Sequence, residues 1–168
     1  MLTSRQGKGQ PMRKQVIAQE VRGERQAEGT FLDLETLARV EITSEDPAHT
    51  IESALVPGNG DGWRAAGPGP QKVRVFFDEP QRIRRVRLVF EEAHAERTQE
   101  FALSWIPAGE KAGQFLVRQQ YTFSPGGATR EVEEYVFDLQ GAAAIELEIV
   151  PDISKGEAVA SLVSLQVG

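Results

Sequence analysis

The chain has 168 residues, of which 40% are hydrophobic and 26% charged, and this composition fits one globular domain with a sizeable core. It contains no cysteine, which excludes disulfides, thiolate metal sites and thiol nucleophiles. The formal net charge of −6 argues against general nucleic-acid binding, because phosphate contacts need clustered cations.

The first part of the chain differs in charge from the rest. Residues 1–26 hold six Lys and Arg against two Glu, so the remaining residues carry an excess of ten negative charges. We expect 1–26 to form a basic, flexible extension and 27–168 to form the domain. The sequence shows neither an apolar run of signal-peptide length at its start nor one long enough for a membrane span, so we expect a cytoplasmic location.

Alternation of apolar and polar residues dominates the chain from residue 38 onward and predicts strands, because successive strand side chains point to opposite faces. We expect eight strands, which start near residues 38, 73, 86, 101, 115, 132, 145 and 160. Turn residues separate them at 78–80, 107–109, 125–127, 140–141 and 155–156. On the fifth strand, the residues Phe115 to Phe123 at odd positions are expected to share one apolar face. The pattern predicts an all-β fold, an eight-stranded antiparallel jelly-roll β-sandwich.

Two segments before the second strand are not simple alternations. Residues 16–37 fit either a strand or a helical turn. One short helical turn is expected at "TIESALV", where Ile51, Ala54 and Leu55 have helical spacing.

The glycine-rich stretch "PGNGDGWRAAGPGP", residues 57–70, follows that turn. A phosphate cradle would need its glycines at the N-terminus of a helix, and no helical pattern follows. Three other uses stay open. Asp61 could join backbone carbonyls around a structural calcium ion, Trp63 could offer a platform for a ligand, or Trp63 could plug one end of the sandwich.

The order of these segments resembles a known family. A strand with a polar outer face, the turn "TIESAL", the loop "GNGDGW" and the segment "PQKVRVFFDEPQRIRRVRLVF" follow one another. This order resembles the discoidin, or coagulation-factor type C, branch of the galactose-binding-like domains over about residues 30–168. The resemblance implies a β-sandwich binding module in which Trp63 packs inward. The paired cysteines of secreted animal members are absent, and the loop before Trp63 is shorter than the family's.

Loops at one end of such a sandwich are the expected ligand site. Sugar recognition needs planar polar groups and, often, a flat aromatic face. The candidate ligand-binding residues are Asn59, Asp61, Trp63, Arg64, His94, Arg97 and Arg130. We therefore predict a carbohydrate-binding module. The alternative is a protein-interaction or assembly module on the same scaffold without a sugar site.

Catalytic motifs are missing from the sequence. Neither His49 nor His94 lies in a nucleophile motif, and no GxSxG is present. The adjacent acids Glu91-Glu92 and Glu133-Glu134 would face opposite sides of a strand, which does not suit an acid/base pair. We expect no enzyme activity.

Overall fold

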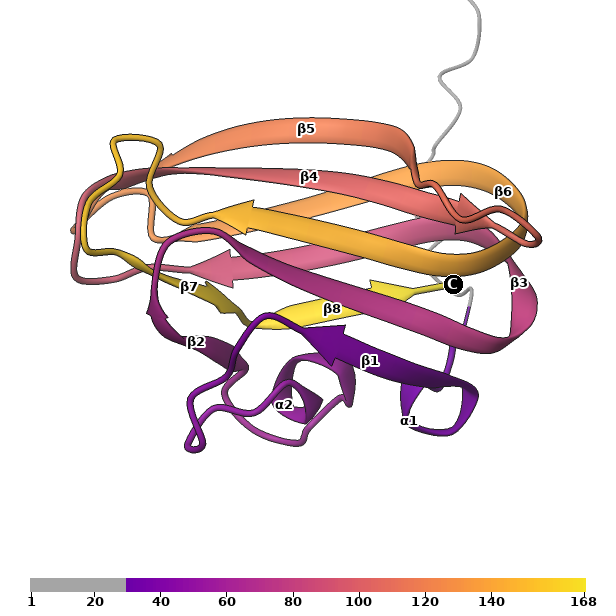
Figure 1. Ribbon diagram of the computed structural model, residues 1–168. Coiled ribbons are helices and arrows are strands. Elements are labelled where there is room, and N and C mark those ends of the chain that lie inside the picture. The colour runs from indigo at the N-terminus through magenta and orange to yellow at the C-terminus, as the bar shows by residue number, and fades with distance from the viewer. Residues whose placement is uncertain (1–29) are drawn as a thin grey trace, which may run out of the picture.

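The computed structural model describes residues 30–168 as a β-sandwich of two packed layers (Figure 1). The all-β prediction is confirmed, whereas the expected extension over residues 1–26 lies outside the described residues. In chain order the elements are α1 Leu34–Leu37, β1 Ala38–Ile42, α2 Glu52–Leu55, β2 Trp63–Pro68, β3 Gln71–Glu91, β4 Arg97–Pro107, β5 Gln114–Phe123, β6 Arg130–Val150, β7 Val159–Leu162 and β8 Ser164–Val167.

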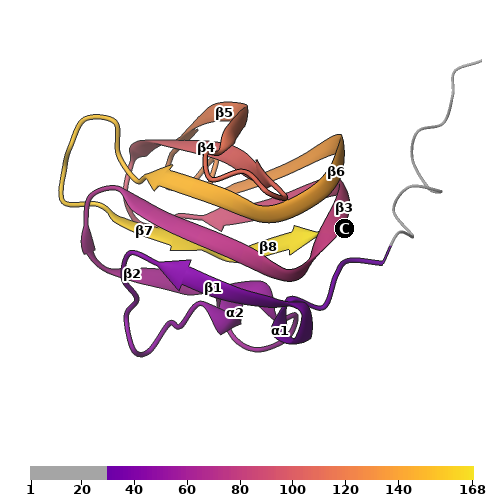
Figure 2. The same cartoon turned by 45° about the vertical axis from the view of Figure 1, so that its right-hand side comes forward.

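The two long strands β3 and β6 contribute to both layers. They pair antiparallel from Gln71↔Ile149 to Glu91↔Arg130, with register shifts between residues 76 and 85. One layer has the order β1-β3-β6-β4-β5, and β8 pairs with the second half of β3 in the other layer. Figure 2 shows the two strands curving together from one layer into the other.

Two expected strand breaks are therefore wrong. The turn residues at 78–80 and 140–141 lie at this bend, inside continuous strands. The pairing of β3 with β6 stops at Phe76↔Ala144 and resumes at Gln81↔Ala142, so residues 77–80 of β3 form a bulge at the bend. Gly141 has φ +71, a value that glycine adopts at little cost, and it marks the bend in β6.

The glycine-rich stretch also contains a strand. Trp63 pairs with Leu162 and Arg64 with Ser161, so residues that we expected in a loop form β2 against β7. The single terminal strand expected from residue 160 is divided at Val163, whose backbone N–H donates to the carbonyl of Val89 at 2.9 Å. The alternation shifts there by one residue, so that Leu162 and Leu165 are both buried.

One face assignment on β5 is wrong. The β4–β5 register shifts between Leu103, which pairs with Val117, and Ser104, which pairs with Phe115. This irregularity turns Phe115 outward, where it is 61% exposed. The guanidinium of Arg118 lies 5.6 Å from the centre of its ring.

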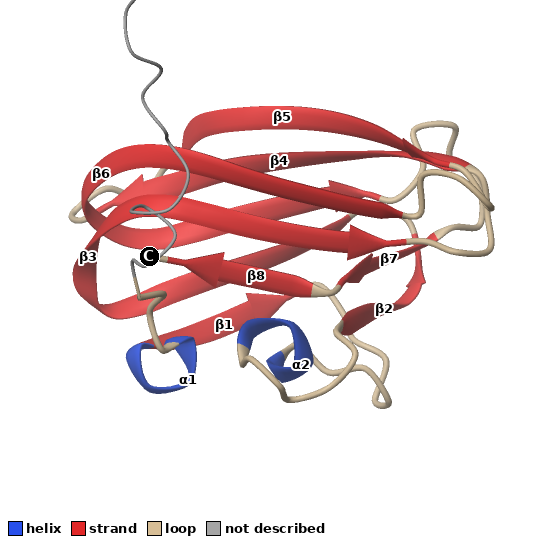
Figure 3. Cartoon of the chain, turned by 180° about the vertical axis from the view of Figure 1, so that it is seen from behind, coloured by secondary structure: helices blue, strands red, loops and turns tan. Residues whose placement is uncertain are grey.

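The helical turns close one side of the sandwich. α2 forms where it was expected, and α1 resolves part of the ambiguous segment as a helical turn. Figure 3 shows both turns beside β1 and β8. The described residues include no helix that is long and apolar enough to span a membrane.

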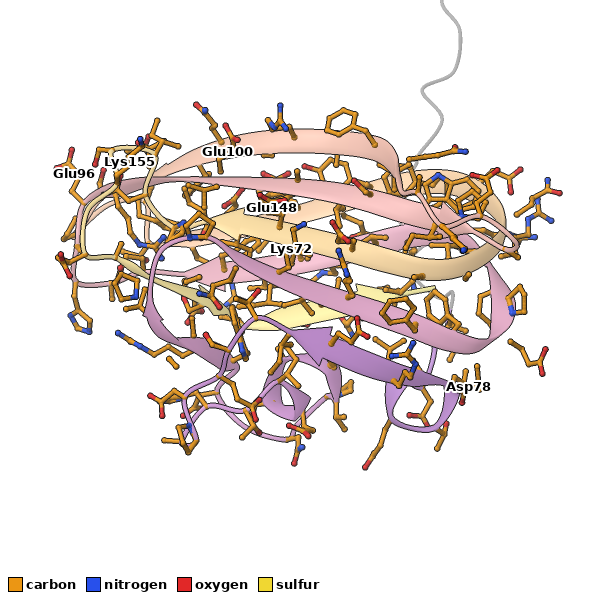
Figure 4. The ribbon with its side chains drawn as sticks, viewed as in Figure 1. Lys72, Asp78, Glu96, Glu100, Glu148 and Lys155 are labelled. Atoms are coloured by element: carbon orange, nitrogen blue, oxygen red, sulfur yellow. The ribbon has the colours of Figure 1, made fainter. Side chains whose placement is uncertain are left out.

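The core lies between the layers, and the outer face of the five-strand layer is charged. Side chains such as Val75, Leu88 and Leu147 have no exposed surface. Lys72 and Glu148 lie on that outer face, 4.0 Å apart between Nζ and Oε2, with Glu100 nearby (Figure 4). Exposed pairs of this kind contribute little stability, so burial holds the fold.

Candidate functional site

A hollow of about 430 Å³ lies at the end of the sandwich away from the C-terminus. It forms between the β3–β4 loop, the β6–β7 loop and β2 with β7. Figure 4 places Glu96 of the first loop and Lys155 of the second at this same end. The polar residues that line the hollow are Arg64, Glu91, Glu92, His94, Glu157 and Ser161, with small apolar side chains between them.

The β3–β4 loop is fixed by Glu92. Oε1 of its carboxylate accepts a hydrogen bond from Nε of Arg97 at 2.9 Å, and Oε2 accepts one from the backbone N–H of His94 at 3.3 Å. Burial alone would raise the pKa of Glu92, but the hydrogen bonds from Arg97 and His94 outweigh it and hold the pKa below its ordinary value. Glu92 is thus a carboxylate that shapes the loop and carries His94 at the surface.

The β6–β7 loop is fixed by a turn at Asp152. Its Oδ1 accepts hydrogen bonds from the backbone N–H of Ser154 at 2.9 Å and from the Ser154 hydroxyl at 2.7 Å. These two bonds lower the pKa of Asp152. The backbone N–H of Ile153 donates to the carbonyl of Thr98 at 2.9 Å, which ties the loop to β4.

Arg97 lies beneath the hollow and joins the two loops. Besides its bond to Glu92, its Nη1 donates to the carbonyl of Pro151 at 2.6 Å and to Oε1 of Gln99 at 3.3 Å. The guanidinium also packs over the ring of Phe123 at 4.9 Å. The side chain of Arg97 is only 2% exposed, so the prediction that Arg97 contacts a ligand directly is wrong. Arg97 supports the two loops from inside.

Trp63 packs into the hydrophobic core of the sandwich. The residue is 1% exposed, and its Nε1–H donates to the carbonyl of Ser44 at 3.0 Å. The inward packing implied by the family resemblance is therefore confirmed. The prediction that Trp63 binds a ligand is wrong, because its buried ring offers no aromatic face to a ligand.

The structure brings together two of the other predicted site residues. Arg64 and His94 both line the hollow, and within residues 30–168 neither side chain makes a hydrogen bond or salt bridge. Arg130 is not among the residues that line the hollow, although its Nη1 donates to the carboxylate of Glu91, which does line it.

Asn59 and Asp61 are not among the residues that line the hollow. They belong to the loop that follows α2, where the carbonyl of Asn59 accepts a hydrogen bond from the Ser53 hydroxyl at 3.1 Å. The neighbouring Gly60 lines a smaller groove against β8.

Sequence reasoning missed the three acidic side chains that line the hollow. Glu91 and Glu92 were considered only as an unsuitable acid/base pair, and Glu157 lies in a loop without any motif. Only the convergence of distant segments places these three carboxylates together.

The loop at Asp61 has few side chains that could bind a calcium ion. Among residues 30–168, no group of three or more His, Asp or Glu side chains could hold a metal ion. Calcium takes about six to eight oxygen ligands, and Asp61 supplies one carboxylate. A calcium site at this loop stays a prediction.

Comparisons with known proteins identify the fold. No protein-family model matches the sequence, and no curated protein matches it. Among solved structures, the family 32 carbohydrate-binding module of NanJ from Clostridium perfringens, in complex with galactose, is similar with a TM-score of 0.60 and 16% identity, over 82% of this chain and 97% of that one. The chain has the galactose-binding-like β-sandwich fold of the discoidin type.

Two further structures of this fold are similar. The module CpGH89CBM32-5 from Clostridium perfringens, in complex with GalNAc-β-1,3-galactose, gives a TM-score of 0.59 at 15% identity, over 82% of this chain and 99% of that one. A pectin-binding carbohydrate-binding module gives 0.57 at 18% identity, over 79% and 90%. The galactose-binding-like fold therefore extends over most of the described chain.

Proposed function

We propose that this galactose-binding-like chain is a carbohydrate-binding module and that it holds a sugar in the end hollow. One observation carries the proposal. Arg64, His94 and Glu157 come from three separate segments, converge on the hollow, and make no side-chain hydrogen bond or salt bridge within the described chain. Polar groups gathered in a concave site without partners of their own are available to a ligand.

The chemistry of these groups suits sugar hydroxyls. A guanidinium donates in its plane, an imidazole donates and accepts, and a carboxylate accepts with two oxygens. Small apolar side chains such as Ala93 and Ala158 leave room for the C–H face of a pyranose. The sugars named in the similar structures, galactose and GalNAc-β-1,3-galactose, support the same ligand class.

The residues lining the hollow include no aromatic side chain, and this affects the expected affinity. Without a stacking platform the sugar is held by hydrogen bonds, which exchange with those to water and leave a small net gain. We expect a Kd of about 1 mM for a monosaccharide.

Titration with sugars followed by amide NMR tests the proposal, because this method detects weak binding and maps it. Galactose and N-acetylgalactosamine are the first probes. We expect shifts at 91–95 and 157–161, and a loss of affinity of about tenfold in Arg64→Ala and in His94→Ala. Arg84→Ala is the matched control, because Arg84 is exposed and lies away from the hollow. Its backbone N–H donates to the carbonyl of Gly168, at the opposite end of the sandwich.

Two results would overturn the sugar site. One is an absence of shifts with these sugars and of any hit on a glycan array. The other is shifts that persist unchanged in the Arg64 and His94 variants, which would place binding elsewhere.

We also infer that the module does not cleave its ligand. Glycoside hydrolysis needs a carboxylic acid with a raised pKa beside a second carboxylate. In the hollow, the pKa of Glu92 is lowered, and Glu91 is bonded to Arg130. Incubation with chromogenic glycosides is expected to release no product, and turnover that disappears in Glu92→Gln would contradict this inference.

A further inference from the structure

A buried chain of polar side chains leads from the start of β6 to the hollow. Glu131 is 1% exposed and Gln99 is fully buried. The amide Nε2 of Gln99 donates to Oε2 of Glu131 at 3.4 Å, while its Oε1 accepts from Nη1 of Arg97 at 3.3 Å. Since Arg97 holds Glu92 and Pro151, these contacts connect Glu131 to both loops of the hollow.

One atom in this chain is left without a partner. Among the described residues, Oε1 of Glu131 is the buried side-chain oxygen or nitrogen that makes no hydrogen bond. An ionised carboxylate in that position would be strongly disfavoured, because burial removes water and nothing replaces it. A protonated carboxyl resolves the problem, since it carries an O–H that can donate to a neighbouring acceptor.

The neighbours of Glu131 favour the same protonation state. Glu133 follows two positions later on the same face of β6. Burial, then the charge of Glu133, then contact with its carboxyl raise the pKa of Glu131 to about 8, against smaller opposing effects of Gln99 and Arg97. The carboxyl of Glu133 is thus the acceptor in reach of a neutral Glu131.

We propose that Glu131 is a positioning residue of the end hollow, and that it acts as a neutral carboxylic acid whose proton keeps Gln99 and Arg97 in place beneath the two loops. The link to ligand binding rests on the proposed function. The link to the loops does not, because it concerns only contacts within the chain.

The groups around Glu131 determine what its ionisation would do. Glu133 and Tyr135 lie on β6, Gln99 and Arg97 on β4, Phe90 opposite on β3, and on β5 Tyr121 donates to the backbone carbonyl of Arg130 at 3.0 Å. Arg97 is the cation of this set. A negative Glu131 beside a negative Glu133 would draw the guanidinium away from Glu92, and the β3–β4 loop would lose its anchor.

Hydrogen exchange of the loop amides tests the proposal without any ligand. From about pH 6.5 to about pH 9.5, after correction for intrinsic base catalysis, exchange at 92–96 and 151–158 should rise about tenfold in the wild type. In Glu131→Gln, which keeps the shape of the neutral acid but cannot ionise, the rise should stay within about twofold. Glu134→Gln is the matched control, since Glu134 lies on the outer face of the same strand, and it should behave as the wild type.

Carboxyl ¹³C NMR of the wild type provides a second, independent measurement. The carboxyl of Glu131 should titrate near the midpoint of the change in the loops. An ordinary titration of Glu131 in the acid range would overturn the proposal, as would an equal response of the loops in Glu131→Gln. The proposed function can fail separately: loops that respond as expected in a protein that binds no sugar would leave Glu131 a positioning residue of the loops alone.

Discussion

Arg97 and Glu92 form a salt bridge of 2.9 Å in which the arginine side chain is 2% exposed and the glutamate side chain 21%. The pair spans the base of the β3–β4 loop, and the same guanidinium holds the carbonyl of Pro151 on the β6–β7 loop. The hollow is therefore organised from beneath by a cation that does not face it. This relationship separates residues that shape the site from residues that can meet a ligand.

Removal of Arg97 should destabilise the protein more than removal of an exposed arginine. In Arg97→Ala, Glu92, Pro151 and Gln99 lose a partner, and the partly buried position of Glu92 suggests a loss of about 2–3 kcal/mol in the free energy of unfolding. Arg118→Ala is the control, because Arg118 forms an exposed pair with Glu100 at 3.4 Å, and should cost less than about 1 kcal/mol. Equal losses by urea unfolding would show that Arg97 does not brace the loops.

Trp63 should behave as a core residue. Trp63→Ala removes a side chain that is 1% exposed and also the hydrogen bond to Ser44, so we expect a loss of about 3–5 kcal/mol. Trp63→Phe keeps most of the volume and should cost less. Denaturant unfolding of both variants measures this difference. A Trp63→Ala variant as stable as the wild type would contradict the placement of Trp63 in the core.

Gly62 and Gly69 provide a matched comparison of backbone constraints. Both have positive φ, +106 and +96, but a Cβ at Gly62 would lie 2.5 Å from the carbonyl oxygen of Leu162, whereas nothing lies within 4 Å of one at Gly69. Gly69→Ala should cost about 1 kcal/mol from backbone strain alone. Gly62→Ala should cost clearly more, because β2 and β7 must separate. Thermal melts that shift equally for the two variants would contradict the close approach.

The stability of the protein should fall as pH rises toward the pKa of Glu131. The ordinary pKa of a glutamate is 4.5, and burial in the native state raises that of Glu131 to about 8. Between these values the native state keeps a proton that the unfolded chain has lost, so the free energy of unfolding decreases with pH and levels off above about 8.

Glu131→Gln should remove this dependence. At the lower end of this pH range, the Glu131→Gln variant should be as stable as the wild type. At about pH 9 its free energy of unfolding should exceed that of the wild type by roughly 2–4 kcal/mol. Tyr135 does not interfere, because burial and then the charges of Glu133 and Glu131 raise its pKa to about 12. Urea unfolding across the window measures the slope, and parallel curves for variant and wild type would refute the assignment.

Local patterns in the sequence predicted the layers of this fold. Alternation predicted strands that start near residues 101 and 145, and the apolar residues at alternate positions of these strands, Phe101, Leu103, Ile145 and Leu147, are buried. The helical spacing of Ile51, Ala54 and Leu55 likewise predicted α2. These features are readable because each depends on a period of two or of about four residues, which the sequence displays directly.

The errors arose where pairing between distant segments overrides local preference. Turn residues at 78–80 predicted a break, yet β3 is continuous there: its pairing with β6 stops at Phe76↔Ala144 and resumes at Gln81↔Ala142 across a bulge. The glycines around Trp63 predicted a loop, yet residues of this stretch form the strand β2, which pairs with β7. Phe115 turned outward because the register with β4 shifts by one residue.

The sequence by itself determined the class of fold and the kinds of polar side chains available for binding, but it left open whether Trp63 is buried or exposed to a ligand. Only the tertiary structure decided which of these polar side chains meet. Arg64 and His94 reach the hollow, Arg97 lies under it, and Asn59 and Asp61 are not part of it. The reason is physical: burial follows from local periodicity, whereas a binding site depends on which loops the sheet topology brings to the same end of the sandwich.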